Sequence, residues 1–356
     1  MISFYFVGGS MDLEKKIILN EIIKKARQMA KMNSCAYCGK ETTKLCYSHT
    51  IPKFILKKIN DNGMIYNANA YNHLGMLDII KKENGIEEAG TFRMICQNCD
   101  NSIFQEYEDE TRISQYPTNK IMTEIALKNT LKVWSKRNIE ICLYNEIKNM
   151  APFTPYCGIA EHHNMINEID LAEIKHDFKK CRTILEKDLK SGMKLMFWHK
   201  CDYVVPISFQ GSICLYGNLN GLIINDIYNY SSNLVMQYIH ICVFPLENES
   251  VVMVFYHKDA AKYKTFERQF NKLNLDDKLR LISFIIFNYS EDFFVSKNAN
   301  DTLKNNHLLY TTMENNSNIV ADNIEDLMNQ KIQKVRELQN YKDFPNILGN
   351  EFALFK

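Results

Sequence analysis

The sequence lacks the features that define several large classes of protein. It has no run approaching the ~20 apolar residues of a membrane-spanning helix. Its net charge is only +1 over 356 residues, which argues against a strongly basic nucleic-acid coat protein. It also lacks an internal repeat, a glycine-rich phosphate loop and a G-x-S-x-G motif. The hydrophobic content of 46% nevertheless indicates a folded globular protein.

A convincing secretion signal is also lacking. Segment 1–9 is apolar, but it is short, has no basic region and runs directly into charged residues from Asp12 onward. We therefore expect a cytoplasmic protein whose first domain begins near Met11. In a reducing compartment, paired cysteines are metal ligands more often than disulfides. The eleven cysteines of the chain are therefore not read as a disulfide framework.

Four of the cysteines form two C-x2-C pairs. Cys35 and Cys38 precede Gly39, and Cys96 and Cys99 follow after 57 intervening residues. A C-x2-C pair followed by glycine is typical of a zinc knuckle, because the tight turn points backbone amides at the sulfur atoms. Together the two pairs predict a structural zinc site with four thiolate ligands. Buried free thiols are the alternative interpretation.

The segment between the two pairs contains a histidine on a predicted short strand. This strand covers Tyr47 to Lys53 and is stopped by Pro52. The neighbouring elements expected from the pattern are a helical turn over 54–59, a loop over 60–75, a strand over 91–95, helix caps at 100–102 and a helix over 103–113.

These motifs, taken together, resemble those of the HNH endonucleases. The resemblance covers Ser34 to Arg112 and rests on the two cysteine pairs, on Ser48-His49-Thr-Ile-Pro between them, and on the Asp100 that follows the last cysteine. It implies a ββα-metal core in which structural zinc holds a hairpin and a helix together. It also implies hydrolysis of nucleic-acid phosphodiester bonds with a catalytic divalent cation, Mg²⁺ or Mn²⁺.

The resemblance implies roles for individual residues. His49 matches the general base that activates water, a task suited to a neutral imidazole. Asp100 matches a ligand of the catalytic cation. The family's metal-binding aspartate before the histidine is Ser48 here, so a further acid, Glu106 or Glu108, is expected to complete the metal site.

Phosphate contacts are expected close to these residues. Lys53 and Arg93 are the candidates, and residues 11–60 hold eleven basic against four acidic side chains. This excess suits nucleic acid, with DNA as the expected partner, although a solvated helix face explains it equally. Asn69 and Asn72 are candidates for the middle asparagine of the family motif.

Other interpretations of the same residues remain open. Cys46-x2-His49 is itself a metal-ligand spacing, so His49 could bind zinc instead of acting as a base. Asp100 could cap a helix, and the acidic residues from Glu106 to Glu110 could form a solvated helix face. In a further interpretation Ser48 marks a lost metal site, and the chain is a catalytically inactive zinc-knuckle protein that binds nucleic acid or a protein partner.

Beyond Thr118 the pattern changes. Helices are expected over 119–136 and 138–150, and Pro152 and Pro155 mark a domain boundary. We therefore predict an HNH-like domain with flanking helices over 11–150 and a second domain over 151–356. A trio of Cys157, His162 and His163 is read as incidental.

The second domain is predicted to be α+β with an antiparallel sheet. Its expected elements are a helix over 168–190, strands over 194–198, 203–209, 212–216, 222–225, 239–243 and 251–256, a helix over 275–289, a loop over 297–318 and a last helix over 324–338. It carries no recognisable catalytic set. We expect it to supply specificity, regulation or a protein-binding surface for the nuclease. The resemblance to HNH endonucleases suggests a role in anti-phage defence.

Overall fold

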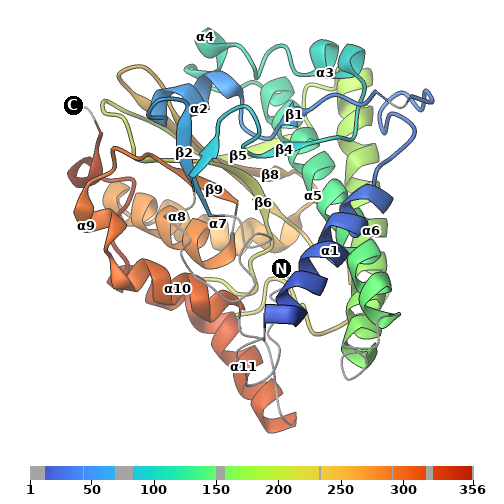
Figure 1. Ribbon diagram of the computed structural model, residues 1–356. Helices are drawn as coiled ribbons and strands as arrows, with labels where there is room; N and C mark the ends of the chain where they lie inside the picture. The colour runs from blue at the N-terminus through green and yellow to red at the C-terminus, as the bar shows by residue number, and fades with distance from the viewer. Residues whose placement is uncertain are drawn as a thin grey trace.

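The computed structural model describes residues 13–42, 44–68, 83–149, 157–231, 234–290, 292–317 and 324–354. Within these residues the fold is mixed α+β, as predicted, with eleven α-helices and an antiparallel sheet of seven strands (Figure 1). None of the described helices is long and apolar enough to cross a membrane.

The seven-stranded sheet forms the centre of the molecule. Its strands follow the order β3-β2-β9-β6-β7-β8-β5, and each neighbouring pair is antiparallel. Their bounds are β2 Met64–Ala68, β3 Glu83–Gly85, β5 Met193–Cys201, β6 Ile207–Ile213, β7 Ile239–Pro245, β8 Ser250–His257 and β9 Phe293–Val295. The predicted β7–β8 hairpin is confirmed, whereas the strands expected over 212–216 and 222–225 do not form beyond the end of β6.

Strands from both sides of residue 150 share this sheet. Tyr66 of β2 lies opposite Val295 of β9, more than two hundred residues away along the chain. The loop predicted over 60–75 is therefore wrong over 64–68, and Asn69 and Asn72 lie outside the described residues. The domain boundary at 150/151 stays a prediction, but the two parts are joined through continuous strand pairing.

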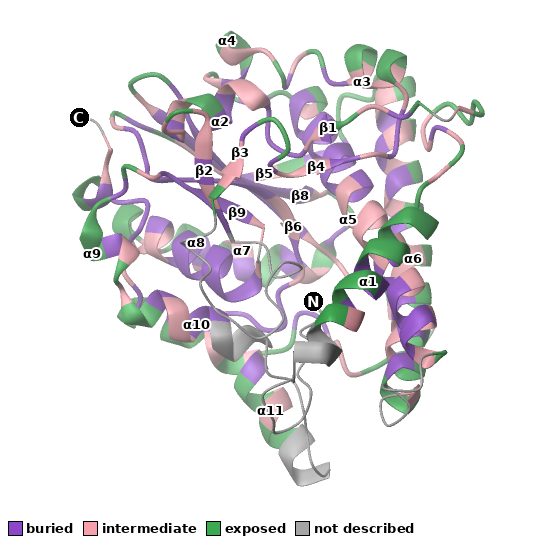
Figure 2. Ribbon diagram, in the orientation of Figure 1, coloured by how far each residue is buried: buried purple, intermediate pink, exposed green. Residues whose placement is uncertain are grey.

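Alternation along β7 divides the core between the two faces of the sheet. Ile239 and Ile241 belong to the core that includes α7 (Lys264–Asn271) and α8 (Leu275–Tyr289). Cys242 and Phe244 belong to the core on the other face, with α2 (Lys53–Ile59), α5 (Asn119–Lys148) and α6 (Cys157–Glu186). Because side chains of a strand alternate between faces, burial on both faces requires a continuous apolar strand. Figure 2 shows these central strands as largely buried.

A long helical hairpin lies beside the sheet. α5 (Asn119–Lys148), capped by the Thr118 hydroxyl, and α6 (Cys157–Glu186) are continuous helices of 30 residues each. The helix break predicted near residue 137 is wrong, since neither glycine nor proline interrupts the pattern there. α1 (Leu13–Met29) packs on the hairpin through Leu19, Ile22 and Ala26 against Leu143 and Ile147.

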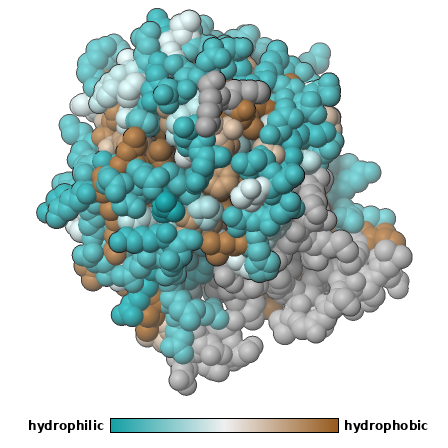
Figure 3. All heavy atoms as spheres, turned by 90° about the vertical axis from the view of Figure 1, so that its left-hand side faces the viewer, coloured by the Kyte–Doolittle hydropathy of each residue, from teal (hydrophilic) through white to brown (hydrophobic). Residues whose placement is uncertain are grey.

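The remaining elements connect or cover these layers. They are β1 Ser48–His49, β4 Thr91–Phe92, α3 Gln97–Ile103, α4 Glu110–Ile113, α9 Asp301–Lys304, α10 His307–Ser317, α11 Ile324–Arg336 and the short 3₁₀ helices Ala261–Tyr263, Glu337–Asp343 and Asn350–Phe352. The loop predicted over 297–318 is wrong, because α9 and α10 occupy most of it. The face on the α9 side is mainly hydrophilic with scattered apolar groups (Figure 3).

Candidate zinc centre and the adjoining lysine site

The four predicted zinc ligands come together. The sulfur atoms of Cys35, Cys38, Cys96 and Cys99 all lie within 4.8 Å of one another, and those of Cys38 and Cys96 are 3.9 Å apart. A tetrahedral Zn²⁺ with four thiolate ligands requires such a cluster. These residues could therefore hold a structural zinc ion.

Backbone geometry positions the sulfur atoms. Gly39 has a positive φ of 72°, which lets the first knuckle turn back on itself. The Cys96 N–H donates to the Cys35 sulfur over 3.3 Å, and the Ala36 N–H donates to the Met94 carbonyl over 2.8 Å. The two knuckles are thus held against each other by main-chain contacts as well as by the four sulfur atoms.

The acidities of the thiols differ within the cluster. Burial raises the pKa of Cys35 and of Cys99, whereas a hydrogen bond from the Lys40 N–H lowers the pKa of Cys38 to about 7. Four thiolates at this spacing repel one another unless a cation lies among them. A zinc ion would remove that repulsion.

Cys46 and His49 are not part of the cluster. The Cys46 thiol donates to the Ile95 carbonyl over 3.2 Å, and burial raises its pKa to about 12. The Nε2 atom of His49 lies 3.1 Å from the carbonyl oxygen of Ile86. The structure describes no contact of either residue with the four clustered sulfur atoms.

A two-stranded ladder carries the Ser-His motif. β1 pairs with β4, with Ser48 opposite Phe92 and His49 opposite Thr91. Successive side chains of a strand point to opposite faces. Ser48 is accordingly buried and turned toward α5, whereas His49 is half-buried and faces the segment around Ile86.

A lysine that the sequence did not single out lies at the centre of the neighbouring polar site. The Nζ atom of Lys128, on α5, is 2.8 Å from the Ser48 hydroxyl, 2.9 Å from Asp100 Oδ1 and 3.0 Å from Glu108 Oε1. It also lies 3.8 Å from the centroid of the Phe104 ring. The three oxygen atoms and one aromatic face surround the ammonium group.

This environment satisfies the lysine completely. The side chain of Lys128 is 0% exposed, and an ammonium group has three donors and no acceptor. Three oxygen acceptors match the three donors, and the Phe104 ring adds a cation–π contact. The Ser48 hydroxyl accepts from Lys128 and donates to Asp100 over 2.7 Å, so the site is one connected network.

The proposed catalytic residues are only partly brought together. Asp100 and Glu108 meet at Lys128, whereas Glu106 pairs with Lys120 over 2.9 Å and with Arg112 over 3.5 Å. No hydrogen bond joins His49 to Asp100 within the described part of the chain. An arrangement of His49 and Asp100 around one catalytic cation therefore stays a prediction.

The helix boundaries around Asp100 differ from the prediction. α3 begins after its N-cap residue Cys96, so Asp100 lies inside the helix and does not cap it. The helix predicted over 103–113 is wrong: α3 ends at Ile103, and Asp109 caps the short α4. Phe104 and Tyr107 are fully buried in the turn between them, and this turn carries Glu108 to Lys128.

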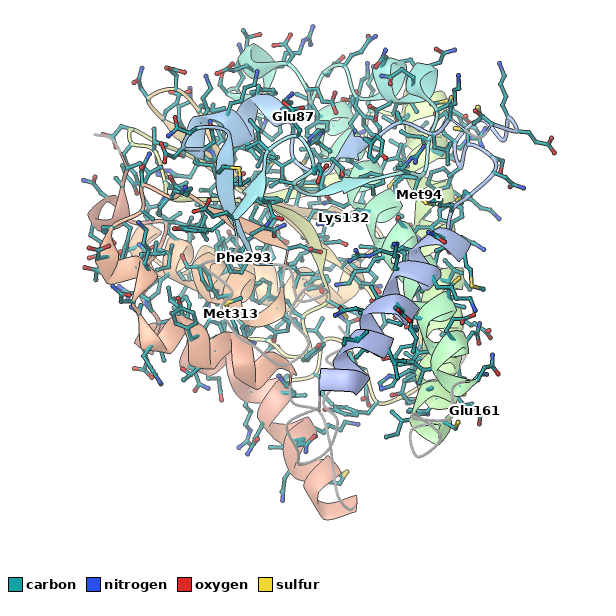
Figure 4. The ribbon with its side chains drawn as sticks, viewed as in Figure 1. Glu87, Met94, Lys132, Glu161, Phe293 and Met313 are labelled. Atoms are coloured by element: carbon teal, nitrogen blue, oxygen red, sulfur yellow. The ribbon has the colours of Figure 1, made fainter. Side chains whose placement is uncertain are left out.

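The two predicted phosphate contacts have partners within the protein. Lys53 forms an ion pair with Glu87, which lies near the top of the view in Figure 4. The Nε atom of Arg93 donates to the Leu45 carbonyl over 3.2 Å. The Arg93 guanidinium lies 4.7 Å from the centroid of the Tyr47 ring, and Tyr47 is 67% exposed.

Sequence reasoning missed Lys128 and the exposed Tyr47–Arg93 pair. The sequence contained one weak indication that Lys128 is buried, because this lysine lies among apolar residues of a predicted helix. Searches of protein-family models, curated proteins and solved structures gave no match to this chain. The resemblance to HNH endonucleases therefore rests on the motif residues, of which the four-cysteine cluster is the part supported by the structure.

Proposed function

We propose that this chain is a zinc-supported DNA-binding protein in which the Lys128 ammonium replaces the divalent cation of an HNH-like site. The observation that carries the proposal is the convergence of Ser48, Asp100 and Glu108 on the lysine Nζ atom at 2.8 to 3.0 Å. Two of these three residues, Asp100 and Glu108, are among those expected from the sequence to bind a catalytic cation.

An ammonium group and a divalent cation cannot share these oxygen atoms. Like charges about 3 Å apart repel strongly in a buried site, so a metal ion could bind only after Lys128 left it. Departure would separate the ammonium from all three acceptors and from Phe104. Metal-dependent hydrolysis is therefore not expected while the lysine holds this position.

The surface next to the zinc cluster suits a nucleic acid. Tyr47 offers an exposed ring with the Arg93 guanidinium stacked on it, and bases stack on such aromatic and guanidinium planes. Lys40 and Lys44 are exposed nearby and have no ion-pair partner among the described residues. They could neutralise backbone phosphates.

The experiment measures binding and cleavage with the same DNA. Fluorescence anisotropy would follow labelled single-stranded and duplex DNA, and plasmid nicking would be assayed with Mg²⁺ and with Mn²⁺. We expect salt-sensitive binding that Tyr47→Ala weakens about tenfold, since stacking contributes ~1–3 kcal/mol per base. We expect no nicking by the wild type.

Tyr116 supplies a matched control for Tyr47. It is 68% exposed, its ring meets the Trp198 ring edge-on, and the described residues show no contact of it with Tyr47 or Arg93, so Tyr116→Ala should leave DNA affinity unchanged. Equal losses in the two variants, or no DNA binding by the wild type, would overturn the proposed binding surface.

The second candidate is the metal-dependent HNH-type endonuclease, with a defensive role against phage and with residues 151–356 providing specificity, regulation or a protein partner site. It is favoured by the way Asp100 and Glu108 already converge on one cation. In that case Mg²⁺ or Mn²⁺ would displace Lys128, and nicking by the wild type would be lost in His49→Ala.

A further inference from the structure

A small cavity lies between the α5–α6 hairpin and the sheet, and none of its lining residues belongs to the Lys128 network. Its volume is about 80 Å³. Its lining includes Asp177 of α6, Ser212 of β6, His240 of β7 and His257 of β8, with Ile174 and Met193 among its apolar walls. A largely apolar pocket with a few convergent polar groups is typical of a small-molecule site.

His240 presents a hydrogen-bond donor in this cavity. It is 8% exposed, and its ring stacks on Phe255. Gln210 donates to the Asn129 side-chain oxygen over 3.0 Å, which leaves the Asn129 amide nitrogen facing His240 Nδ1 at 3.2 Å. Nδ1 therefore accepts, and the ring proton is on Nε2. Burial lowers the pKa of His240 to about 3, so the ring is neutral.

His257 also lines the cavity. Its Nδ1 lies 3.3 Å from the Asp259 backbone nitrogen and 3.4 Å from Asp259 Oδ2. Burial lowers the pKa of His257, and this favours the neutral ring. The contacts of His240 are the ones that fix a donor, and its Nε2–H has no protein acceptor among the described residues.

Asp177 supplies an acceptor from the other wall. Its carboxylate lies 3.6 Å from the Lys180 ammonium, and both side chains are about one-third exposed. Burial raises the pKa of Asp177, because the partly buried carboxylate has lost solvating water. A bound N–H donor would restore what the water supplied.

We infer that this cavity binds the amide group of a small uncharged ligand, with the carbonyl oxygen on the His240 Nε2–H donor and the amide N–H on Asp177. The inference does not depend on DNA binding. An anionic ligand would be repelled by Asp177 and Asp259, and an ammonium ligand has no acceptor for the His240 donor. An amide matches donor and acceptor together.

The volume limits the size of the buried group. A cavity of ~150 Å³ holds benzene, and a liquid water occupies ~30 Å³. About 80 Å³ therefore admits an amide head of four to six heavy atoms by rough proportion, or two to three waters. Exposed Val235 and Asp259 at the lining let the remainder of a longer ligand extend outward.

The test uses acetamide and 2-pyrrolidone as probes on the full chain. Titrations would follow the imidazole ¹H–¹⁵N signals of His240 and His257 by NMR, with acetate and methylammonium as charged comparisons. We expect the two amides to shift both signals and the two ions to leave them unchanged. Asp177→Asn should weaken acetamide binding about tenfold, as expected for loss of a hydrogen bond to a charged group.

His240→Phe keeps a ring that can stack on Phe255 and removes the donor, so it should abolish amide binding. His199→Phe is the matched control, because His199 stacks on Phe197 of β5 and does not line the cavity. If neither amide shifts the histidine signals, as expected for a cavity filled only by water, the inference is overturned. Acetate binding as tightly as acetamide, or undiminished binding in Asp177→Asn, would also overturn it.

Discussion

Replacement of Lys128 by methionine tests the central feature of the polar site. Methionine keeps an unbranched apolar side chain on α5 but removes the ammonium group. Asp100 and Glu108, which are 15% and 37% exposed, would then face each other without their shared cation. The Ser48 hydroxyl would retain its hydrogen bond to Asp100.

The expected loss of stability follows from this exposure. Removing one partner of a buried ion pair costs ~3–5 kcal/mol, because the remaining charge is left without compensation. Glu108 is exposed enough to regain water, so the loss should be near the lower end, about 3 kcal/mol. A divalent cation could then bind the vacated oxygen atoms and restore about 2.7 kcal/mol at a hundredfold excess over its Kd.

Urea unfolding, followed by tryptophan fluorescence with and without Mn²⁺, measures both effects. Lys190→Met is the control, since Lys190 is 85% exposed in its pair with Asp188 and such surface pairs contribute at most ~1 kcal/mol. Lys128→Met and Lys190→Met losing equal stability would refute the account of the site. If Mn²⁺ does not change the stability of Lys128→Met, the proposal that the lysine ammonium stands in for a metal ion is refuted.

Three further predictions concern other parts of the chain. Purified protein should contain about one zinc ion per chain by atomic absorption. Cys96→Ser should lower that zinc content, because a closed structural site needs four ligands. Full zinc occupancy in the variant would contradict the proposed site. Burial raises the pKa of Glu124 from 4.5 to about 7. The folded state then holds a proton that the unfolded state has lost, so the free energy of unfolding should fall as pH rises from about 4.5 through about 7. Glu124→Gln should flatten this fall when urea unfolding is measured across that pH range. An unchanged pH dependence in the variant would contradict the prediction. A Cβ atom at Gly217 would lie 1.9 Å from the Val335 carbonyl oxygen, so Gly217→Ala should lower the free energy of unfolding by ~1–3 kcal/mol, whereas Gly85→Ala, which meets nothing within 4 Å, should not.

The fold could be predicted where its cause is local. The helix expected over 275–289 is observed with the same bounds as α8, because its apolar spacing is a pattern of adjacent residues. The observed cap, Asn274, lies directly before it. The β7–β8 hairpin follows in the same way from alternation on either side of a turn. By contrast, β2 becomes a strand because it pairs with β9, and no property of residues 64–68 alone indicates that partner.

The candidate site shows the same division. Cysteine spacing identified the four clustered sulfur atoms, because a metal-binding knuckle is a local pattern. Lys128 is 80 residues from Ser48 along the chain, and a lysine on a helix usually faces solvent. Glu108 reaches the site because buried Phe104 and Tyr107 end the helix that was expected there.

Ser48, which stands where the HNH motif that the sequence resembles has an aspartate, and the position of Lys128 explain each other physically. A carboxylate at residue 48 could accept from the lysine but could not donate to Asp100, and it would add a third negative charge beside one ammonium group. The Ser48 hydroxyl does both tasks, since it accepts from Lys128 and donates to Asp100. A cation of lower charge is thus matched by one carboxylate fewer. Ser48→Asp while Lys128 remains would therefore create a repulsive cluster, not a metal site.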